Sequence, residues 1–329
     1  MKIEQTYDEG RILSRMNRWR GILAIVVMLS HIWGYTGLVF LVPFNKMVTI
    51  SVFLFFVLSG FGMTRSAEKK QGYIKGIYTE KIPRLFFMSL LAYLAGAAMQ
   101  AILKIPGDPE IRFLPVNAAG YIETTNWYVY ELAGFYILFS LTSLIRDKRA
   151  CLAVTGICSA AGFVILYHTA PVEAYYNSIF GYVCGMILGS VPFAETMKKH
   201  RHGYIAGLII LAAAFGIMFA ADKDSLFFAL VRNLAGIGAV ILLLYVSVYV
   251  DLNSKMNGRL CRISPELFFY HMPAALLLSR KIQNPYAYAG VVIAVSLILA
   301  MIFHFVDDTV HGLWKKLVLH QTNPGQKRG

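Results

Sequence analysis

Long apolar runs, separated by short polar and mostly basic segments, follow one another along almost the whole chain. A helix that crosses a membrane needs about 20 apolar residues, so about ten such runs account for roughly 200 residues. In a chain of 329 residues, this leaves only short loops and tails. Charged residues make up 15% of the chain, against about 25% in soluble domains. The sequence predicts an all-α polytopic membrane protein, a single domain over residues 1–329 with short cytoplasmic tails at about 1–18 and 307–329.

The limits of the apolar runs place the expected spans. The first run continues well past the apolar region of a signal peptide, so we expect an uncleaved first span. The expected spans are residues 19–42, 48–63, 85–105, 127–145, 151–167, 178–193, 204–221, 226–250, 265–278 and 288–306.

Lysine and arginine are unevenly distributed between the two sets of loops. With the N-terminus inside, 24 of the 31 lie in cytoplasmic segments and 7 lie outside. This bias predicts that the N-terminus is cytoplasmic, and an even number of spans then places the C-terminus on the same side.

Basic loops facing an anionic leaflet explain the net charge of +13. The expected partner is therefore a lipid bilayer, and no nucleic acid is expected.

The four cysteines offer no redox or metal motif. None of them forms a CxxC pair, and no Cys/His cluster has the spacing of metal ligands. We therefore expect no metal.

Ionisable side chains inside membrane spans are costly and usually functional. Arg20 and His31 are eleven residues apart in the first span, which is about three helical turns, so both point to one face with a rise of about 16 Å between them. This predicts Arg20 at the cytoplasmic interface and His31 about halfway across. The simpler alternatives are a membrane anchor for Arg20 and an interhelical hydrogen bond for His31. Gly21 leaves room for close approach by a ligand or another helix.

The ninth span begins with a typical helix start, Ser264 followed by Pro265 and Glu266. His271 lies seven residues after Ser264 and therefore on the same face. Pro273 removes an amide from the helix, which suggests a polar cavity beside His271, or simply a kinked structural helix.

The fourth span begins at Trp127, which suits the outer aromatic belt. Glu131 lies one turn further in, on the face of Trp127. It is either a substrate contact, an acid/base group or the ion-pair partner of a buried Arg or His.

A dense basic stretch lies between the second and third spans and ends with Lys81 and Arg84. It is explained either by attraction to the anionic leaflet or by phosphate binding, for which Arg is the better bidentate group.

Together, these residues resemble the membrane-bound acyltransferase 3 family, which includes bacterial O-acetyltransferases of surface polysaccharides. Four segments match in family order. They are the Arg-x10-His signature at Arg20 and His31, SVFLFFVLSGFGMTRS at residues 51–66, Trp127 with Phe135 and Tyr136, and Ser264 with His271.

Two segments depart from the family pattern. In KIPRLFF, Lys81 stands where an arginine is usual, and the proline precedes Arg84 instead of following it. Pro265 replaces the usual tyrosine after the late serine. An extracytoplasmic esterase-like domain, which many members carry, is not expected here.

The resemblance implies acyl transfer from a cytoplasmic acyl-CoA to a hydroxyl of a surface or lipid-linked carbohydrate, in a bacterial plasma membrane. It implies that His31 is catalytic, as general base or as acyl carrier. Donor-binding residues would be Arg20, Arg84 and Lys81, and residues on the acceptor side, or supporting it, would be His271, Ser264, Glu131 and Trp127.

Two other classes of function are alternatives to the acyltransferase. A transporter or flippase of a glycan or lipid precursor also carries intramembrane ionisable groups, but favours broken helices in matched halves. A non-catalytic membrane module would not need Arg20 and His31 on one face. The acyl group, the acceptor and the oligomeric state are left open by the sequence.

Overall fold

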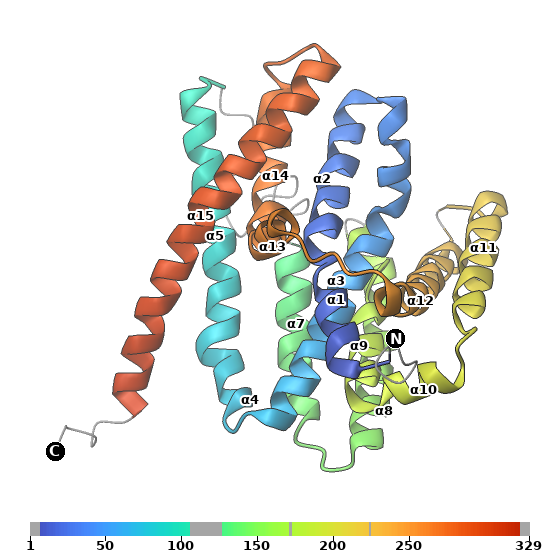
Figure 1. Cartoon of the computed structure of the whole chain (residues 1–329). Helices are drawn as coiled ribbons and strands as arrows, with labels where there is room; N and C mark the ends of the chain where they lie inside the picture. The colour runs from blue at the N-terminus through green and yellow to red at the C-terminus, as the bar shows by residue number, and fades with distance from the viewer. Residues whose placement is uncertain (1–6, 106–126, 171–172, 224, 323–329) are drawn as a thin grey trace. The chain divides into compact units, whose positions relative to one another are not determined.

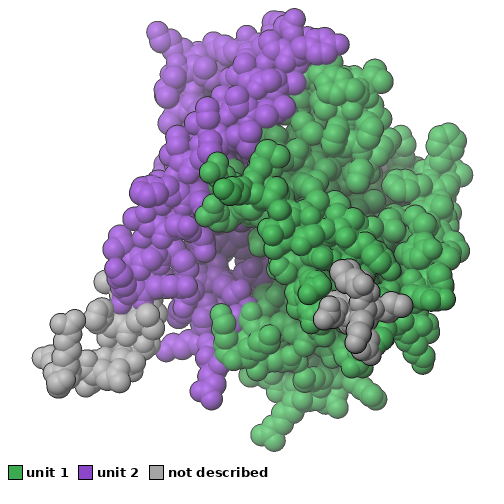
Figure 2. Space-filling model, viewed as in Figure 1, with its two compact units in different colours: residues 1–70, 137–264 green, residues 71–136, 265–329 purple. Residues whose placement is uncertain are grey.

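The computed structural model describes residues 7–105, 127–170, 173–223 and 225–322 (Figure 1). The described residues form helices and turns without a β-strand, which confirms the predicted all-α class. The chain divides into two compact units, each built from two stretches of sequence (Figure 2). Unit 1 comprises residues 1–70 and 137–264, and unit 2 comprises residues 71–136 and 265–329.

Unit 1 is built around α3, which packs against α2, α9 and α12, while α11 packs along α12. Its helices are α1 (Glu9–Asn17), α2 (Arg20–Thr36), α3 (Val42–Lys69), α8 (Lys148–Thr169), α9 (Phe180–Ser190), α10 (Phe193–Lys199), α11 (Tyr204–Ala220), α12 (Leu226–Tyr249) and α13 (Lys255–Arg262).

Unit 2 holds a smaller set of helices, in which α15 packs against α5. Its elements are α4 (Tyr73–Gly76), a π-helical turn (Ile77–Lys81), α5 (Ile82–Ile102), most of α14 (Ser264–Ser279) and α15 (Pro285–Thr322). The first ten residues of helix α7 (Trp127–Thr142) belong to unit 2, and the rest belong to unit 1.

Every predicted span falls on a helix, but the helices differ in length. Five helical segments are long and apolar enough to cross a membrane, and α9 with α10, bent by 85°, adds a sixth if the pair is one span. The remaining predicted spans coincide with shorter helices of 16 or 17 residues, namely α2, α7, α11 and α14. The chain is therefore a multi-pass membrane protein, whereas the count of ten spans and the sidedness stay predictions.

The boundary between the first two spans differs from the prediction. Helix α2 ends at Thr36 because Gly37 adopts a left-handed conformation with φ 64°, which glycine tolerates at a helix end. A short 3-10 turn follows, and α3 begins at Val42 with Pro43 in its first turn, where a missing amide costs nothing. The apolar run continues through this corner, so hydropathy alone gave a first span that was too long.

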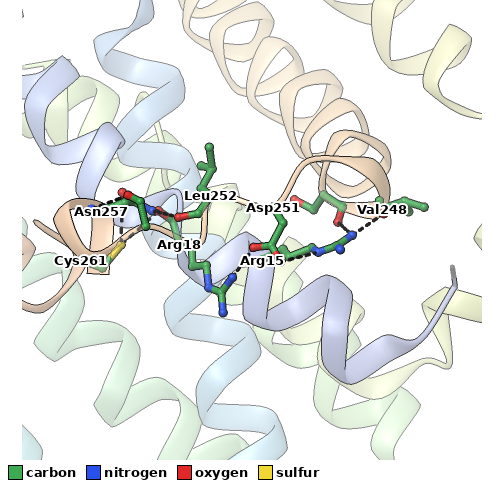
Figure 3. A network of polar contacts seen from close by, with 9 residues as sticks. Arg15, Arg18, Val248, Asp251, Leu252, Asn257 and Cys261 are labelled. Atoms are coloured by element: carbon green, nitrogen blue, oxygen red, sulfur yellow. Dashed lines mark hydrogen bonds and ion pairs between the residues drawn. The ribbon is translucent and has the colours of Figure 1, made fainter. Parts of the chain in front are cut away.

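A short helix that was not predicted, α1, packs against α12 in unit 1. It begins with an N-cap from Asp8 and buries Ile12 and Met16. Arg15 donates hydrogen bonds to the carbonyls of Ser247 and Val248 at the end of α12, and its Nε lies 3.6 Å from an oxygen of Asp251 (Figure 3). The last carbonyls of a helix lack intrahelical partners, so Arg15 satisfies two groups that would otherwise need water.

Close contact between α3 and α9 depends on glycines that repeat every fourth residue of α9. A Cβ atom on Gly185 would lie 2.1 Å from the carbonyl oxygen of Val57, and one on Gly181 would lie 2.5 Å from that of Phe53. Gly60 of α3 faces the opposite way, because its Cβ would lie 2.2 Å from the carbonyl oxygen of Tyr182. Small residues at this spacing let membrane helices approach closely.

We expect Gly185→Ala to destabilise the protein, because the new methyl group meets backbone that can move only with its helix. Overpacking of this kind costs roughly 1–3 kcal/mol or more. Thermal unfolding of the detergent-solubilised protein, followed by size-exclusion chromatography, measures the effect. Gly156→Ala on α8 is the matched control, because its Cβ would have no heavy atom within 4 Å. Equal melting curves for the two variants would contradict this account.

Helix α15 extends well past the predicted tenth span. It continues to Thr322, so the tail expected from residue 307 begins inside a helix. Residues 1–6 and 323–329 of the predicted tails lie outside the described part of the chain.

Candidate functional site

In unit 1, the predicted site residues Arg20 and His31 lie on one continuous helix. Arg20 is the first residue of α2 and His31 lies on the same helix without a break between them, so the expected separation of about 16 Å along the axis applies. Both side chains are half-buried. Among the described residues, the Arg20 side chain has no hydrogen bond or ion pair, which leaves its guanidinium available to an anion.

The start of α2 is held by α13. A Cβ atom on Gly21 would lie 2.8 Å from the Leu260 Cβ atom, so the space that this glycine provides is taken by a helix, one of the two predicted uses. The Asn257 side chain donates to the carbonyls of Arg18 and Leu252 (Figure 3). These contacts fix the position of the backbone directly before Arg20.

Ser264 connects to the same region through its neighbour Cys261. The Ser264 hydroxyl donates to the Cys261 carbonyl at 3.0 Å, and the Cys261 thiol contacts the Arg18 carbonyl at 3.1 Å. Ser264 is fully buried and is the first residue of α14, so the helix begins where the sequence predicts, although the hydroxyl donates to a carbonyl instead of capping the helix.

In unit 2, Arg84 is engaged by two carboxylates of α15. Its Nε donates to an oxygen of Asp307 at 2.8 Å, and its Nη2 donates to the same oxygen and to Asp308 at 3.2 Å. Asp307 is only 1% exposed, whereas the Arg84 side chain is 35% exposed. A phosphate that binds Arg84 would therefore add to, or displace, an ion pair that is already formed.

Lys81 has no carboxylate partner among the described residues. Its ammonium lies 5.0 Å from the ring centre of Tyr73 and 5.8 Å from that of Tyr136. Contacts with aromatic faces stabilise a cation without pairing it with an anion, so no carboxylate among the described residues compensates the Lys81 ammonium.

The turn that carries Lys81 is a π-helix, Ile77–Lys81, a rare form that is frequent at functional sites. Pro83 lacks the amide that would pair with the Thr79 carbonyl in an α-helix. The indole of Trp314 donates to this carbonyl at 2.7 Å instead. The far end of α15 thereby stabilises the irregular turn beside Arg84.

Aromatic rings connect the fourth and ninth predicted spans within unit 2. Trp127 contacts Tyr128, Tyr128 packs against Phe268, and the Phe268 ring lies 6.0 Å from the ring of His271. The structure therefore brings Trp127 and His271 to one aromatic cluster.

The backbone partner of the buried His271 ring determines which of its two nitrogens carries the proton. Nδ1 lies 2.9 Å from the Leu267 carbonyl oxygen, and a carbonyl only accepts hydrogen bonds. Nδ1 therefore carries the proton, and in the neutral ring Nε2 is left as the basic nitrogen.

Glu131 lies on α7 and is 9% exposed. Both of its carboxylate oxygens are buried without a hydrogen-bond partner in the described part of the chain. The predicted alternative of an ion pair with a buried Arg or His is thus not realised among the described residues. A buried carboxyl group without a partner is costly, so Glu131 remains a candidate for contact with a ligand.

A second polar network in unit 2 was not predicted. His304 Nδ1 lies 2.9 Å from the buried carboxylate of Glu266, and its Nε2 lies 3.5 Å from Asp308. Asp308 also contacts Arg84, so the network connects α14 to α5. The acidic pair at residues 307–308, directly after the last apolar run, was the available sequence signal.

The structure assembles the predicted residues into two groups. Arg20, His31 and Ser264 belong to unit 1, and Lys81, Arg84, Trp127, Glu131 and His271 belong to unit 2. Within the described ranges, no three His, Cys, Asp or Glu side chains are grouped as they would be around a metal ion. The expectation of a metal-free site stays a prediction.

Comparison with known proteins identifies the class of protein. Residues 13–305 match the family model described as an acyltransferase domain, the acyltransferase 3 family. The match covers most of the chain and all the predicted site residues, so the chain belongs to this family of membrane acyltransferases. No curated protein and no solved structure matches it.

Proposed function

We propose that this protein transfers an acyl group, most simply acetyl, from cytoplasmic acyl-CoA to a hydroxyl of a surface or lipid-linked carbohydrate. It would act in a bacterial plasma membrane with about ten spans and both termini in the cytoplasm. The observation that carries the proposal is the placement of Arg20 and His31 on one unbroken helix, with no anionic partner for Arg20 among the described residues.

Donor binding needs cations at the cytoplasmic edge, because acyl-CoA carries several phosphates and does not cross an apolar layer. Arg20 and Lys81 are open to an anion for this purpose, since neither has a carboxylate partner in the described part of the chain. Arg84 contributes a planar guanidinium, which suits phosphate, once its pairing with Asp307 and Asp308 is relaxed.

Acyl transfer itself needs a base, because a sugar hydroxyl is a weak nucleophile at neutral pH. His31 would take the proton as the sugar oxygen attacks the thioester carbonyl. The carbon–sulfur bond then breaks, and the proton passes to the CoA thiolate. In the two-step alternative, His31 first receives the acyl group and then gives it to the sugar.

Residues of unit 2 supply candidates for acceptor binding. His271 presents a basic Nε2, Glu131 presents a buried carboxyl group, and Trp127 presents an aromatic ring. Together they offer hydrogen-bonding groups and a ring face, the usual means of holding a sugar.

Purified protein mixed with radiolabelled acetyl-CoA tests the proposal, by release of free CoA and by transfer of label to candidate sugars. Release of CoA that depends on a sugar acceptor supports it. If neither acetyl-CoA nor succinyl-CoA binds or turns over with any acceptor, the transporter interpretation replaces it.

We expect Arg20→Gln to raise the KM for acetyl-CoA about tenfold or more, because a hydrogen bond to a charged group is worth roughly 1.5–3 kcal/mol. The kcat should change less, since Arg20 would bind the donor far from the thioester. Steady-state kinetics at varied acetyl-CoA measures both constants. Arg259→Gln is the matched control, an exposed arginine of α13. An unchanged KM for Arg20→Gln would remove this residue from the donor site.

A further inference from the structure

Unit 1 contains a cavity that the acyltransferase proposal does not use. It has a volume of about 590 Å³, within the range of small-ligand sites. It lies where α10 leads into α11, beside the end of α12, and Tyr7 before α1 also contributes to it. Its lining consists of Tyr7, Lys198, Arg201, His202, Tyr204, Leu242, Tyr245, Val246 and Tyr249.

The polar side of the cavity is basic. Lys198, Arg201 and His202 line it, and none of the described lining residues is acidic. Arg201 uses its Nε to contact Nε2 of His202 at 3.1 Å, and its two terminal amino groups have no hydrogen bond or ion pair with other described residues. A guanidinium held in this way presents the paired donors that suit phosphate.

Tyrosine hydroxyls add neutral donors to this side. The hydroxyl of Tyr7 lies 3.4 Å from that of Tyr249. Burial, together with this hydrogen bond, raises the pKa of Tyr7 to about 12, so the group stays protonated at physiological pH. The hydroxyl of Tyr245 is engaged by the His200 carbonyl, which fixes the ring that forms the wall.

Another part of the lining is apolar. Leu242, Val246 and the ring of Tyr249 recur along one face of α12. On α11, the apolar surface continues from Tyr204 to Ile205, Leu208 and Ile209, which are 38% to 62% exposed. In a multi-pass membrane protein, such an exposed apolar face lies against lipid chains.

A soluble anion would use the basic side alone, whereas an amphiphile would use both sides. Aromatic belts and basic clusters mark the level of lipid headgroups, and Lys198 and Arg201 belong to a segment that the charge bias places in the cytoplasm. We propose that this cavity binds the phosphate headgroup of an anionic phospholipid, whose acyl chains lie along the exposed face of α11.

Native mass spectrometry of the full-length protein in detergent tests this proposal. Dioleoyl phosphatidylglycerol is titrated against dioleoyl phosphatidylcholine, and the dissociation constant of each adduct is measured. We expect tighter binding of phosphatidylglycerol and a loss of about 25-fold for Lys198→Gln/Arg201→Gln, because each cation near an anionic lipid contributes about fivefold. Tyr249→Phe, at an exposed position, should weaken binding without loss of folding.

Arg146→Gln/Arg149→Gln is the matched control, because it removes two exposed cations from another segment that is predicted to be cytoplasmic. An equal loss in this control would show that net charge alone attracts the lipid, and would overturn the site. Glycerol 3-phosphate serves as the soluble headgroup. Competition by glycerol 3-phosphate at the concentration at which the lipid binds would also overturn the proposal, because the apolar side would then contribute nothing.

Discussion

Replacing His31 with alanine should lower acyl transfer by about 10²- to 10⁴-fold, the usual contribution of a positioned general base. The expected loss is mainly in kcat, because His31 lies about 16 Å along α2 from the cation that would hold the donor phosphates. Release of CoA in the presence of a sugar acceptor measures it, with thermal unfolding to show that the variant folds.

His168→Ala provides the control for His31→Ala. His168 is an exposed histidine near the end of α8 in the same unit. Its replacement therefore removes one imidazole from unit 1 but leaves the first span unchanged. Comparable loss of activity in both variants, or full activity of His31→Ala, would remove His31 from the catalytic step.

Label retained on the protein distinguishes the two roles of His31. If His31 carries the acyl group, wild-type protein incubated with labelled acetyl-CoA and no acceptor retains label after denaturation and releases CoA at once. If His31 is only a base, no label stays on the protein and CoA is released only when an acceptor is present. His31→Ala should retain no label in either case, so label on that variant would point to another carrier.

The sequence predicted where apolar helices lie because span length and hydropathy are local properties. It missed α1, α10 and α13, which are seven to nine residues long and too short for a hydropathy signal. Their positions depend on tertiary contacts, such as those of Arg15 with the end of α12. It also placed the end of α2 too late, although Gly37 and Pro43 mark that corner.

The positions of individual candidate residues on their helices were predictable, whereas the partners of these residues were not. The spacing of Arg20 and His31 needs only helix geometry, and the structure keeps both on one helix. By contrast, Arg84 and Asp307 are more than two hundred residues apart, and nothing in the local sequence shows that they meet. The tautomer of His271 follows from its own helix, through the carbonyl four residues earlier, but only once residues 267–271 are known to be helical.

Arg84 is predicted to bind the donor, but the structure also gives it a structural role, and a double-mutant cycle separates the two. Arg84→Ala leaves the carboxylate of Asp307 buried without its partner. Breaking a buried pair from one side costs up to about 3–5 kcal/mol, and less here because the Arg84 side chain is 35% exposed. We therefore expect Arg84→Ala to melt well below the wild type, and Arg84→Ala/Asp307→Ala to recover much of the difference.

The kinetics of the same variants then separates the effect of Arg84 on donor binding from its effect on the stability of the protein. If Arg84 contacts the donor phosphates, the KM for acetyl-CoA stays raised by about tenfold or more in the stabilised double variant, because the charged hydrogen bond is still missing. Asp307→Ala alone should lower that KM, since the donor no longer competes with Asp307 for the guanidinium. A double variant whose KM returns to the wild-type value would show that Arg84 only holds α5 to α15. Donor recognition would then rest on Arg20 and Lys81, the two predicted cations without a carboxylate partner among the described residues.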